Sequence, residues 1–377
     1  MKVSVTTPSL NQAQYLTHTI ESVLSQEGDF SIEYFVVDGG STDGSVEILR
    51  NYSDRIGNGA HPVRCRGVVF DWVSEPDSGQ SDAINKGLRR STGDVAAYIN
   101  SDDCYLPGAF ATITKTFEQN PRFDFVYGDG NVIDESGAVQ WEWLARPYDH
   151  RVLTSYHFLW NEFTNYLMQQ AVFWRTSVSD TIGYFDETLH YSMDLEYWLR
   201  AGSAGLTLKH IPEKIAEFRL IQGTKSLSDP LAFWSDNLEL FRRYRGDSLA
   251  RFFAYYFYNF ALHRDFNLEE LAADGLQVLA RWKDSPDHDR MDIGAKRGMA
   301  KAYALIALEL QRRGRICEAE IAYRRASIGP MAGAGSAGLL YQLKKAVGAR
   351  GANAINRTVD NLIRTYKRRK YDYRYHS

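Results

Sequence analysis

Short apolar runs alternate with amphipathic stretches along the first third of the chain. β-Branched and aromatic residues form five such runs, at Val3–Thr7, Ile32–Val37, Val68–Val73, Val95–Ile99 and Phe125–Tyr127. Apolar side chains recur at helical spacing between them, over Tyr15–Gln26, Ser45–Tyr52, Ser81–Arg90 and Ala109–Gln119. This alternation predicts an α/β domain with a Rossmann-like, mostly parallel sheet flanked by helices.

The pattern becomes helical from about residue 235 onward. Two helical stretches, Ala300–Arg313 and Ile316–Ala326, are joined at Gly314 and are similar to one tetratricopeptide-type hairpin. No second copy follows at the period of about 34 residues, so no repeat array is predicted. We predict an α/β domain over residues 1–230 and a mainly helical C-terminal region over residues 231–377. That region ends in a basic tail, Tyr341–Ser377.

Composition narrows the class of protein. A chain of 377 residues that is 44% apolar and 13% aromatic has enough apolar surface for a large core. The net charge of −3 argues against nucleic acid as a partner. Cys65, Cys104 and Cys317 form no CxxC pair, which indicates neither a disulfide framework nor a zinc site. No apolar run approaches the roughly 20 residues of a membrane span, so we expect a cytoplasmic protein.

Polar, Gly-rich and acidic segments follow the predicted strands. They read TPSLN, DGGSTDGS, SEPDSGQSD and NSDD, and ligands of open α/β sheets bind at the carboxyl ends of the strands. The first segment has no GxGxxG, which argues against a dinucleotide site, and neither a Walker loop nor a GxSxG elbow occurs. Gly40 stands two residues after Asp38, so a DxD nucleophile is excluded as well.

The adjacent carboxylates of Asp102 and Asp103 end the fourth predicted strand. Neighbouring carboxylates repel and are costly to desolvate, so a positive partner is expected beside them. Mg²⁺ prefers one or two carboxylates together with substrate phosphates, and a cation with a diphosphate would supply that charge. Turn-forming acids are the alternative interpretation.

Several segments together resemble a known family. VTTPSLNQAQYLTHTIESVLSQ, FVVDGGSTDGS, SEPDSGQSDAINKGL and YINSDDCYLPGAF occur in this order, and QQAVFWRTSV and IGYFDETLHYSMDLEYWLR follow. Over about residues 1–226 the chain resembles family 2 glycosyltransferases of the A-type (GT-A) fold that build bacterial polysaccharides. The resemblance implies an inverting, metal-dependent transfer of a sugar from a nucleoside diphosphate sugar to a hydroxyl acceptor, with Mg²⁺ or Mn²⁺. It also implies a nucleotide-sugar half over about residues 1–130 and an acceptor half over about residues 131–230.

The resemblance carries donor-side roles to individual residues. Pro8, Ser9 and Asn11 would contact the nucleoside and Asp38 would hydrogen-bond the base. Asp102 would meet the ribose or the donor sugar, and Asp103 would ligate the metal that bridges the diphosphate.

Further donor-side residues follow in the chain. Asp77, Gln80 and Asp82 would line the donor pocket, and Gln169 and Gln170 would offer amides to sugar hydroxyls. Alternatively, Asp82 caps the following helix and the two glutamines are structural amides.

The catalytic base is implied within Met193-Asp194-Leu195-Glu196. Asp194 aligns with the base, whereas Met193 replaces a Glu that relatives often carry. Glu196 lies two residues further on, about 200° around a helix, so only one of the two carboxylates would face the site. The alternative for Asp194 is a capping or surface carboxylate.

One segment departs from the family pattern. Many relatives carry RLHPGSK where this chain has Arg219-Leu220-Ile221-Gln222-Gly223-Thr224-Lys225. The missing His leaves the second protein ligand of the metal open. Arg219 or Lys225 is then expected to neutralise the leaving diphosphate.

Other interpretations stay open at this stage. The basic tail is either a solvated end or an attachment to anionic lipid at the inner face of the membrane, which would suit a lipid-linked saccharide acceptor. The helical region is an alternative site of homo-oligomer contacts. The rival functions are a sugar-nucleotide hydrolase or nucleotidyltransferase, and a non-catalytic adaptor that keeps the fold.

Overall fold

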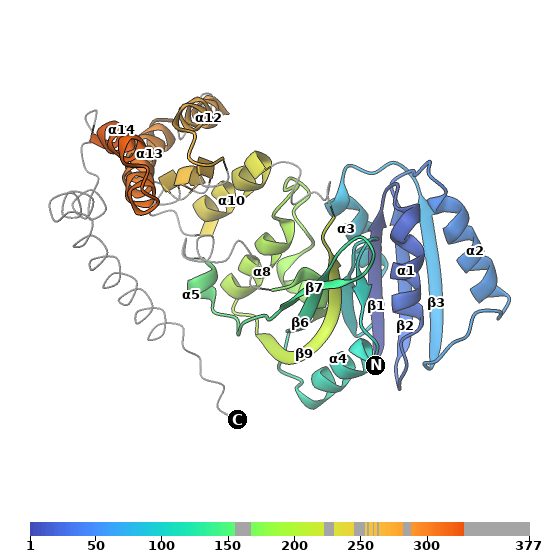
Figure 1. The fold of residues 1–377 in the computed structure, drawn as a ribbon. Helices are drawn as coiled ribbons and strands as arrows, with labels where there is room; N and C mark the ends of the chain where they lie inside the picture. Colours follow the sequence, from blue (N-terminus) through green and yellow to red (C-terminus); the bar gives the residue numbers. More distant parts are fainter. Residues whose placement is uncertain are drawn as a thin grey trace. The chain divides into compact units, whose positions relative to one another are not determined.

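The computed structural model describes residues 1–154, 167–221, 230–244, 264–281 and 288–327, with a few residues between 253 and 261 (Figure 1). These residues belong to two compact units, residues 1–245 and 246–377. Within the described residues, the first unit carries the sheet and the second is helical. The α/β domain and the helical C-terminal region are therefore confirmed. The first unit includes helix α10, which the sequence analysis assigns to the C-terminal region.

One nine-stranded sheet runs through the first unit in the order β3-β2-β1-β4-β8-β6-β9-β5, with β7 paired to β6. The strands are β1 Lys2–Ser9, β2 Ser31–Asp38, β3 Gly67–Ser74, β4 Val95–Tyr98, β5 Cys104–Tyr105, β6 Phe125–Ile133, β7 Val139–Trp143, β8 Val172–Arg175 and β9 Leu208–Arg219. All five predicted strands are present. The other four strands, β5 and β7 to β9, were not predicted.

Parallel pairing is confined mainly to one half of the sheet. Strands β3, β2, β1 and β4 are parallel neighbours, as predicted. Strand β8 joins β4 and β6 in antiparallel pairing, and β6 then pairs in parallel with β9. The sheet as a whole is mixed, and its parallel half presents the carboxyl ends of β1 to β4 along one edge.

Helices cover both faces of this sheet (Figure 1). In the first unit they are α1 Ala13–Leu24, α2 Ser45–Gly57, α3 Gln80–Arg90, α4 Ala109–Gln119, α5 His150–Leu153, η1 Gln169–Ala171, α7 Val178–Ile182, α8 Met193–Ser203 and α10 Pro230–Tyr244. The four helices predicted in this unit match α1 to α4, with ends that differ by at most five residues.

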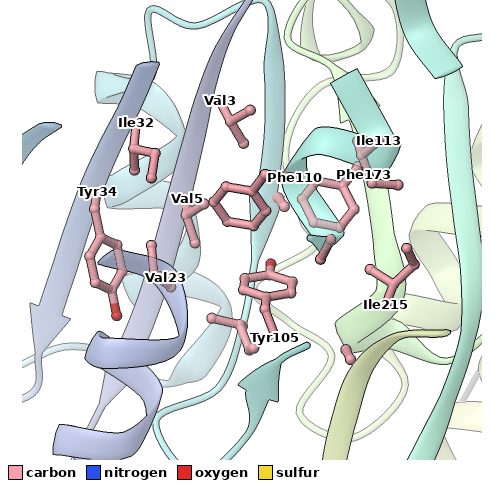
Figure 2. Close-up of a cluster of buried hydrophobic side chains, with 14 of the residues drawn as sticks. Val3, Val5, Val23, Ile32, Tyr34, Tyr105, Phe110, Ile113, Phe173 and Ile215 are labelled. Carbon is pink, nitrogen blue, oxygen red and sulfur yellow. The ribbon is translucent and has the colours of Figure 1, made fainter. Parts of the chain in front are cut away.

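The first core layer lies between the sheet and helices α1, α2 and α4. Figure 2 shows Val3 and Val5 of β1 beside the rings of Tyr105, Phe110 and Phe173. The centroids of the Tyr105 and Phe110 rings are 5.0 Å apart, in an edge-to-face arrangement. Such rings bury large apolar areas, so this layer fixes the sheet against helix α4 and the segment that follows β4.

The second core layer uses the alternate residues of the same strands. Ala96 and Tyr98 of β4 and Trp174 of β8 pack with side chains of α3 and α8. The α3 helix approaches closely because residue 87 is a glycine: a Cβ there would lie 2.3 Å from the side chain of Thr6. Helix α8, which carries Asp194, is therefore anchored on the face that α3 also covers.

The second unit contains a helical hairpin. The described helices of this unit are α12 Leu268–Arg281, α13 His288–Arg312 and α14 Ile316–Ser327, and α13 and α14 form the hairpin. Gly314 adopts φ +79° in the turn, as expected of a glycine there. Small side chains such as Ala307 and Ala322 are fully buried, which allows α13 and α14 to pack closely. The predicted hairpin is confirmed, although α13 begins twelve residues earlier than predicted.

Candidate active site

The loop after β2 is organised around Asp38. Its carboxylate is fully buried and accepts hydrogen bonds from the backbone of Gly40 and Ser41 and from the hydroxyls of Ser41 and Ser74. A base bound by Asp38 would therefore compete with the loop's own hydrogen bonds. The base-binding role of Asp38 stays a prediction, while its structural role is evident.

The loop after β1 is bonded to the loop after β2. Asn11, with φ +52°, accepts a hydrogen bond from the Thr42 amide at 2.9 Å and donates its own amide to the Ser41 hydroxyl at 2.7 Å. Asp43 accepts the amide of Ala13, the first residue of α1. This network lowers the pKa of Asp43 because, although burial opposes it, the ionised carboxylate accepts several hydrogen bonds. Hydrogen bonds therefore hold the loops after β1 and β2 together.

The side chains of Asp77, Leu10 and Ser9 lie close to the loops after β1 and β2. A Cβ on Gly39 would lie 2.8 Å from Asp77 Oδ2 and 3.4 Å from the exposed side chain of Leu10. Asp77 Oδ1 accepts the Gly79 amide. The buried hydroxyl of Ser9, next to Pro8 in β1, has no hydrogen-bond partner among the described residues. An unpaired buried hydroxyl at the end of a strand is a suitable ligand contact.

The start of α3 contains the next two predicted residues. Asp82 accepts the backbone amide and the hydroxyl of Ser78, both at 3.1 Å, and pairs with Lys86. These contacts favour the capping interpretation of Asp82. Gln80 instead donates to the side chain of Asn100 at 2.7 Å, so it reaches toward the end of β4.

Asp103 is fully buried behind the half-buried Asp102. Its Oδ1 accepts the Arg219 backbone amide at 2.8 Å, and its Oδ2 accepts the amides of Gln170 at 2.8 Å and Asn100 at 3.1 Å. Burial raises the pKa of both aspartates, and at Asp103 the negative charge of Asp102 raises it further. The pair is thus an electrostatically costly site that a cation would relieve.

Arg219 supplies part of the positive charge that the sequence analysis expects. Its guanidinium donates to the Asp102 carbonyl at 2.9 Å and to the carbonyls of Asp134 and Glu135, and it stacks over Tyr15. The guanidinium of this buried residue is thus committed to three carbonyl groups. Arg219 braces the aspartate pair, whereas Lys225 and Gln222 lie outside the described residues.

Asn100 connects the donor-side residues and was missed by the sequence analysis. Its side chain accepts from Gln80 and donates to Asp103 and, at 3.4 Å, to Gln169. Gln169 also donates to the Tyr98 carbonyl at 2.9 Å. Gln169, like Gln170 beside Asp103, is therefore part of a buried network of amide side chains. The signal that could have found Asn100 is its position directly before Ser101-Asp102-Asp103 at a strand end.

The aspartate pair is suited to a hard divalent cation whose other ligands come from a bound substrate and water. Asp103 Oδ1 accepts a single hydrogen bond, and the Asp102 carboxylate accepts none from any other described residue. Among the described residues, no group of three or more His, Cys, Asp or Glu side chains could hold a metal. A cation here would therefore take its remaining ligands from phosphate oxygens and water, as Mg²⁺ commonly does.

Asp194 lies at the second residue of α8, near the same strand end. The negative charges of Asp194 and Asp103 both add to the burial that raises the pKa of Tyr98, so both carboxylates lie within electrostatic reach of one phenol. Met193, in place of the Glu of relatives, is buried and accepts a hydrogen bond from Ser81 of α3 at 2.8 Å. The structure thus brings Asp194 to the edge where the donor motifs meet.

Glu196, two residues further along α8, has partners of its own. It is buried, pairs with Arg200 at 2.7 Å and accepts the Tyr244 hydroxyl at 2.6 Å. These partners commit Glu196 to the packing of α8.

Comparisons with known proteins identify the family of the chain. Residues 4–180 match the model of Glycosyl transferase family 2. An uncharacterized glycosyltransferase of Mycobacterium tuberculosis (strain CDC 1551 / Oshkosh) is 30% identical over 200 residues, 53% of this chain and 68% of the relative. A PGL/p-HBAD biosynthesis glycosyltransferase of Mycobacterium bovis (strain BCG / Pasteur 1173P2) is 28% identical, over 53% of this chain and 69% of the relative. An uncharacterized glycosyltransferase of Nostoc is 29% identical over 37% of this chain, which spans 41% of that relative.

A solved structure shares the fold. Residues 1–349 of S. aureus TarS, in complex with UDP-GlcNAc, superpose with a TM-score of 0.50 at 17% identity, over 86% of this chain and 92% of that chain. The sheet and this match show that the chain has a GT-A fold. The chain belongs to glycosyltransferase family 2.

Proposed function

We propose that the chain transfers a sugar from a nucleoside diphosphate sugar to a hydroxyl acceptor. The observation that carries the proposal is that the start of α3 bonds to both parts of the site. Ser81 donates to Met193, next to Asp194, and Gln80 donates to Asn100, which in turn donates to Asp103. One carboxylate pair is suited to the charge of a diphosphate, and the other carboxylate is a separate proton acceptor. In this scheme residues 1–130 hold the donor and residues 131–230 face the acceptor.

The proposed reaction is a single displacement with inversion at the anomeric carbon. The acceptor oxygen forms a bond to that carbon while the bond from the carbon to the diphosphate oxygen breaks. The Asp194 carboxylate takes the hydroxyl proton, and the nucleoside diphosphate leaves with the electron pair. Mg²⁺ or Mn²⁺, held by Asp103 and beside Asp102, would supply stabilisation of the leaving diphosphate.

The donor-side residues are proposed to have different roles, according to the contacts that each of them makes. Asp77 lies beside Gly39, whose amide donates to the Ser9 carbonyl at 2.8 Å. Asp77, Ser9 and its neighbour Pro8 are proposed to contact the nucleoside. Gln80, Gln169 and Asn100 are proposed to orient the aspartate pair through their amide network. Asn11, Asp38 and Asp82 are proposed to act mainly by holding the loops, since their side chains already carry bonds there.

The acceptor and the cellular setting are broader proposals. A saccharide or lipid-linked saccharide used in cell-surface polysaccharide synthesis fits the family, and the name of the M. bovis relative includes PGL/p-HBAD biosynthesis. None of the described helices is both long and apolar enough to cross a bilayer. Cytoplasmic location, peripheral attachment and oligomer formation stay predictions, and the tail that motivates attachment lies outside the described residues.

A two-stage experiment tests the proposed function. Thermal shift with UDP, GDP and other nucleoside diphosphates, with and without Mn²⁺, identifies the donor base, since a ligand at 100 times its Kd adds about 2.7 kcal/mol. Transfer from the matching donor sugars is then measured across a panel of saccharide acceptors. Asp103→Asn is expected to abolish the Mn²⁺-dependent part of the shift. Donor binding without transfer to any acceptor would favour the adaptor alternative.

A further inference from the structure

Helix α10 holds the segment that leads into α8. The Asp236 side chain of α10 accepts three consecutive backbone amides through one oxygen, Oδ2: those of His190 at 3.0 Å, Tyr191 at 2.8 Å and Ser192 at 3.3 Å. Three amides that converge on one carboxylate oxygen form a strong, charge-assisted contact. The segment thus depends on a residue more than forty positions further along the chain.

Other side chains of α10 extend this contact. Ser192 donates its hydroxyl to Asn237 at 3.0 Å, and the Tyr244 hydroxyl donates to Glu196. Arg243 pairs with Asp186 at 2.6 Å, further from the start of α8. Helix α10 therefore contacts both ends of the segment from residue 186 to residue 196.

Helix α8 lacks a side-chain cap of its own. Ser192 occupies the N-cap position but makes no capping hydrogen bond, because its hydroxyl faces Asn237. A carboxylate near a helix N-terminus also interacts favourably with the helix dipole. Asp236 supplies that charge from a different helix.

We propose that Asp236 is a positioning residue for Asp194, the base in the proposed function on which this inference rests. Asp194 follows Ser192 by two residues, and Ser81 and Asn85 of α3 also donate to this segment, at Leu189, Met193 and Glu187. Release of the three amides lets the first turn of α8 shift. A displacement of about 1 Å in a reacting group can cost roughly 10²-fold in rate.

The test compares Asp236→Ala with Arg243→Gln, which removes a contact of the same helix that does not reach residues 190–196. Asp236→Ala is expected to lower kcat at least about tenfold, with donor affinity within about twofold. It should also accelerate hydrogen exchange of the amides of residues 190–192. Arg243→Gln should keep kcat and that protection. Asp236→Asn, which keeps one acceptor oxygen, should fall between them and serves if the Ala variant does not fold.

Each result of this experiment either supports or contradicts the positioning role of Asp236. Unchanged exchange at residues 190–192 in Asp236→Ala, or kcat losses in the two variants that simply follow their Tm, would overturn the positioning role. An Asp194→Asn variant that loses transfer while Asp236→Ala keeps it overturns this inference alone. If Asp194→Asn keeps the full rate, the base assignment fails and the inference fails with it.

Discussion

The donor side and the base side of the candidate site are supported differently. On the donor side, the partners of Asp38 and Asn11 lie within the loops after β1 and β2, apart from Ser74 of β3, so these two loops hold most of their own polar groups. On the base side, the segment before Asp194 takes its hydrogen bonds from α3, about a hundred residues earlier, and from α10. Hydrogen bonds within a motif form when that motif folds. Hydrogen bonds from distant segments form only when the whole fold is complete.

The aspartate pair combines both kinds of support. Asp103 is bonded to nearby Asn100 and to the distant Gln170 and Arg219. Burial makes the ionised pair costly, and the surrounding donors only partly offset that cost. The comparison therefore predicts that changes on the base side affect turnover, whereas changes around the pair affect binding of the nucleotide and cation.

The largest effect is expected for Asp194→Asn. The substitution keeps the size of the side chain and removes the proton acceptor, which typically costs about 10²- to 10⁴-fold. Donor affinity, measured by calorimetry, should stay within a few-fold because Asp194 is proposed to act on the acceptor hydroxyl and not on the nucleoside diphosphate. Glu196→Gln is the control: it should lower Tm by weakening the pair with Arg200 but should largely keep the rate. The base assignment is wrong if Asp194→Asn retains more than about a tenth of the wild-type rate.

A loss of roughly ten- to a hundredfold in cation-dependent nucleotide binding is expected for Arg219→Gln, because truncation frees the backbone at Asp102 and leaves buried carbonyls unpaired. The matched control is Arg175→Gln. Arg175 also donates to three carbonyl groups and stacks over a ring, that of Phe117. Both variants should lose stability, and only Arg219→Gln should lose nucleotide affinity. Equal affinities in calorimetry would show that Arg219 supports the fold alone.

A several-fold weakening of donor binding is expected for Gly39→Ala. The added Cβ would lie 2.8 Å from Asp77 Oδ2, so the carboxylate must move away from its position beside Leu10. Gly67→Ala, at a site where a Cβ meets nothing within 4 Å, is the control. Titration of the nucleoside diphosphate followed by fluorescence or calorimetry measures both. Unchanged affinity in Gly39→Ala would remove Asp77 from the donor site.

The smallest effect is expected in the pH dependence of thermal stability. Because burial raises the pKa of Asp102 and Asp103, the cation-free folded state holds protons that the unfolded chain releases. Their contribution to the free energy of unfolding therefore falls as pH rises above the ordinary Asp range. A cation binds the ionised form, so the increase in Tm caused by Mn²⁺ should be a few degrees larger near pH 8 than near pH 5. A Mn²⁺ shift that is the same at both pH values, or that persists in Asp103→Asn, would contradict the metal assignment.

The sequence by itself determined the α/β class, strands β1 to β4 and β6, helices α1 to α4 and the hairpin at Gly314. These features depend on local periodicity and turn chemistry, which a short window of residues contains. The motifs at the strand ends also predicted where the site lies, since the carboxyl ends of parallel strands share one edge. The spacing of Asp194 and Glu196 predicts that they point apart, and the bond from Tyr244 gives Glu196 a partner in α10.

Only the tertiary structure decided the antiparallel half of the sheet and the partners of each polar group. Strands β8 and β9 pair with segments distant in sequence, and such pairing leaves little local signal. The same reason explains why Asn100, Arg219 and Asp236 acquired roles that the motifs did not reveal. A buried polar group must find a partner wherever the fold brings one, and that choice is made by packing across the whole unit.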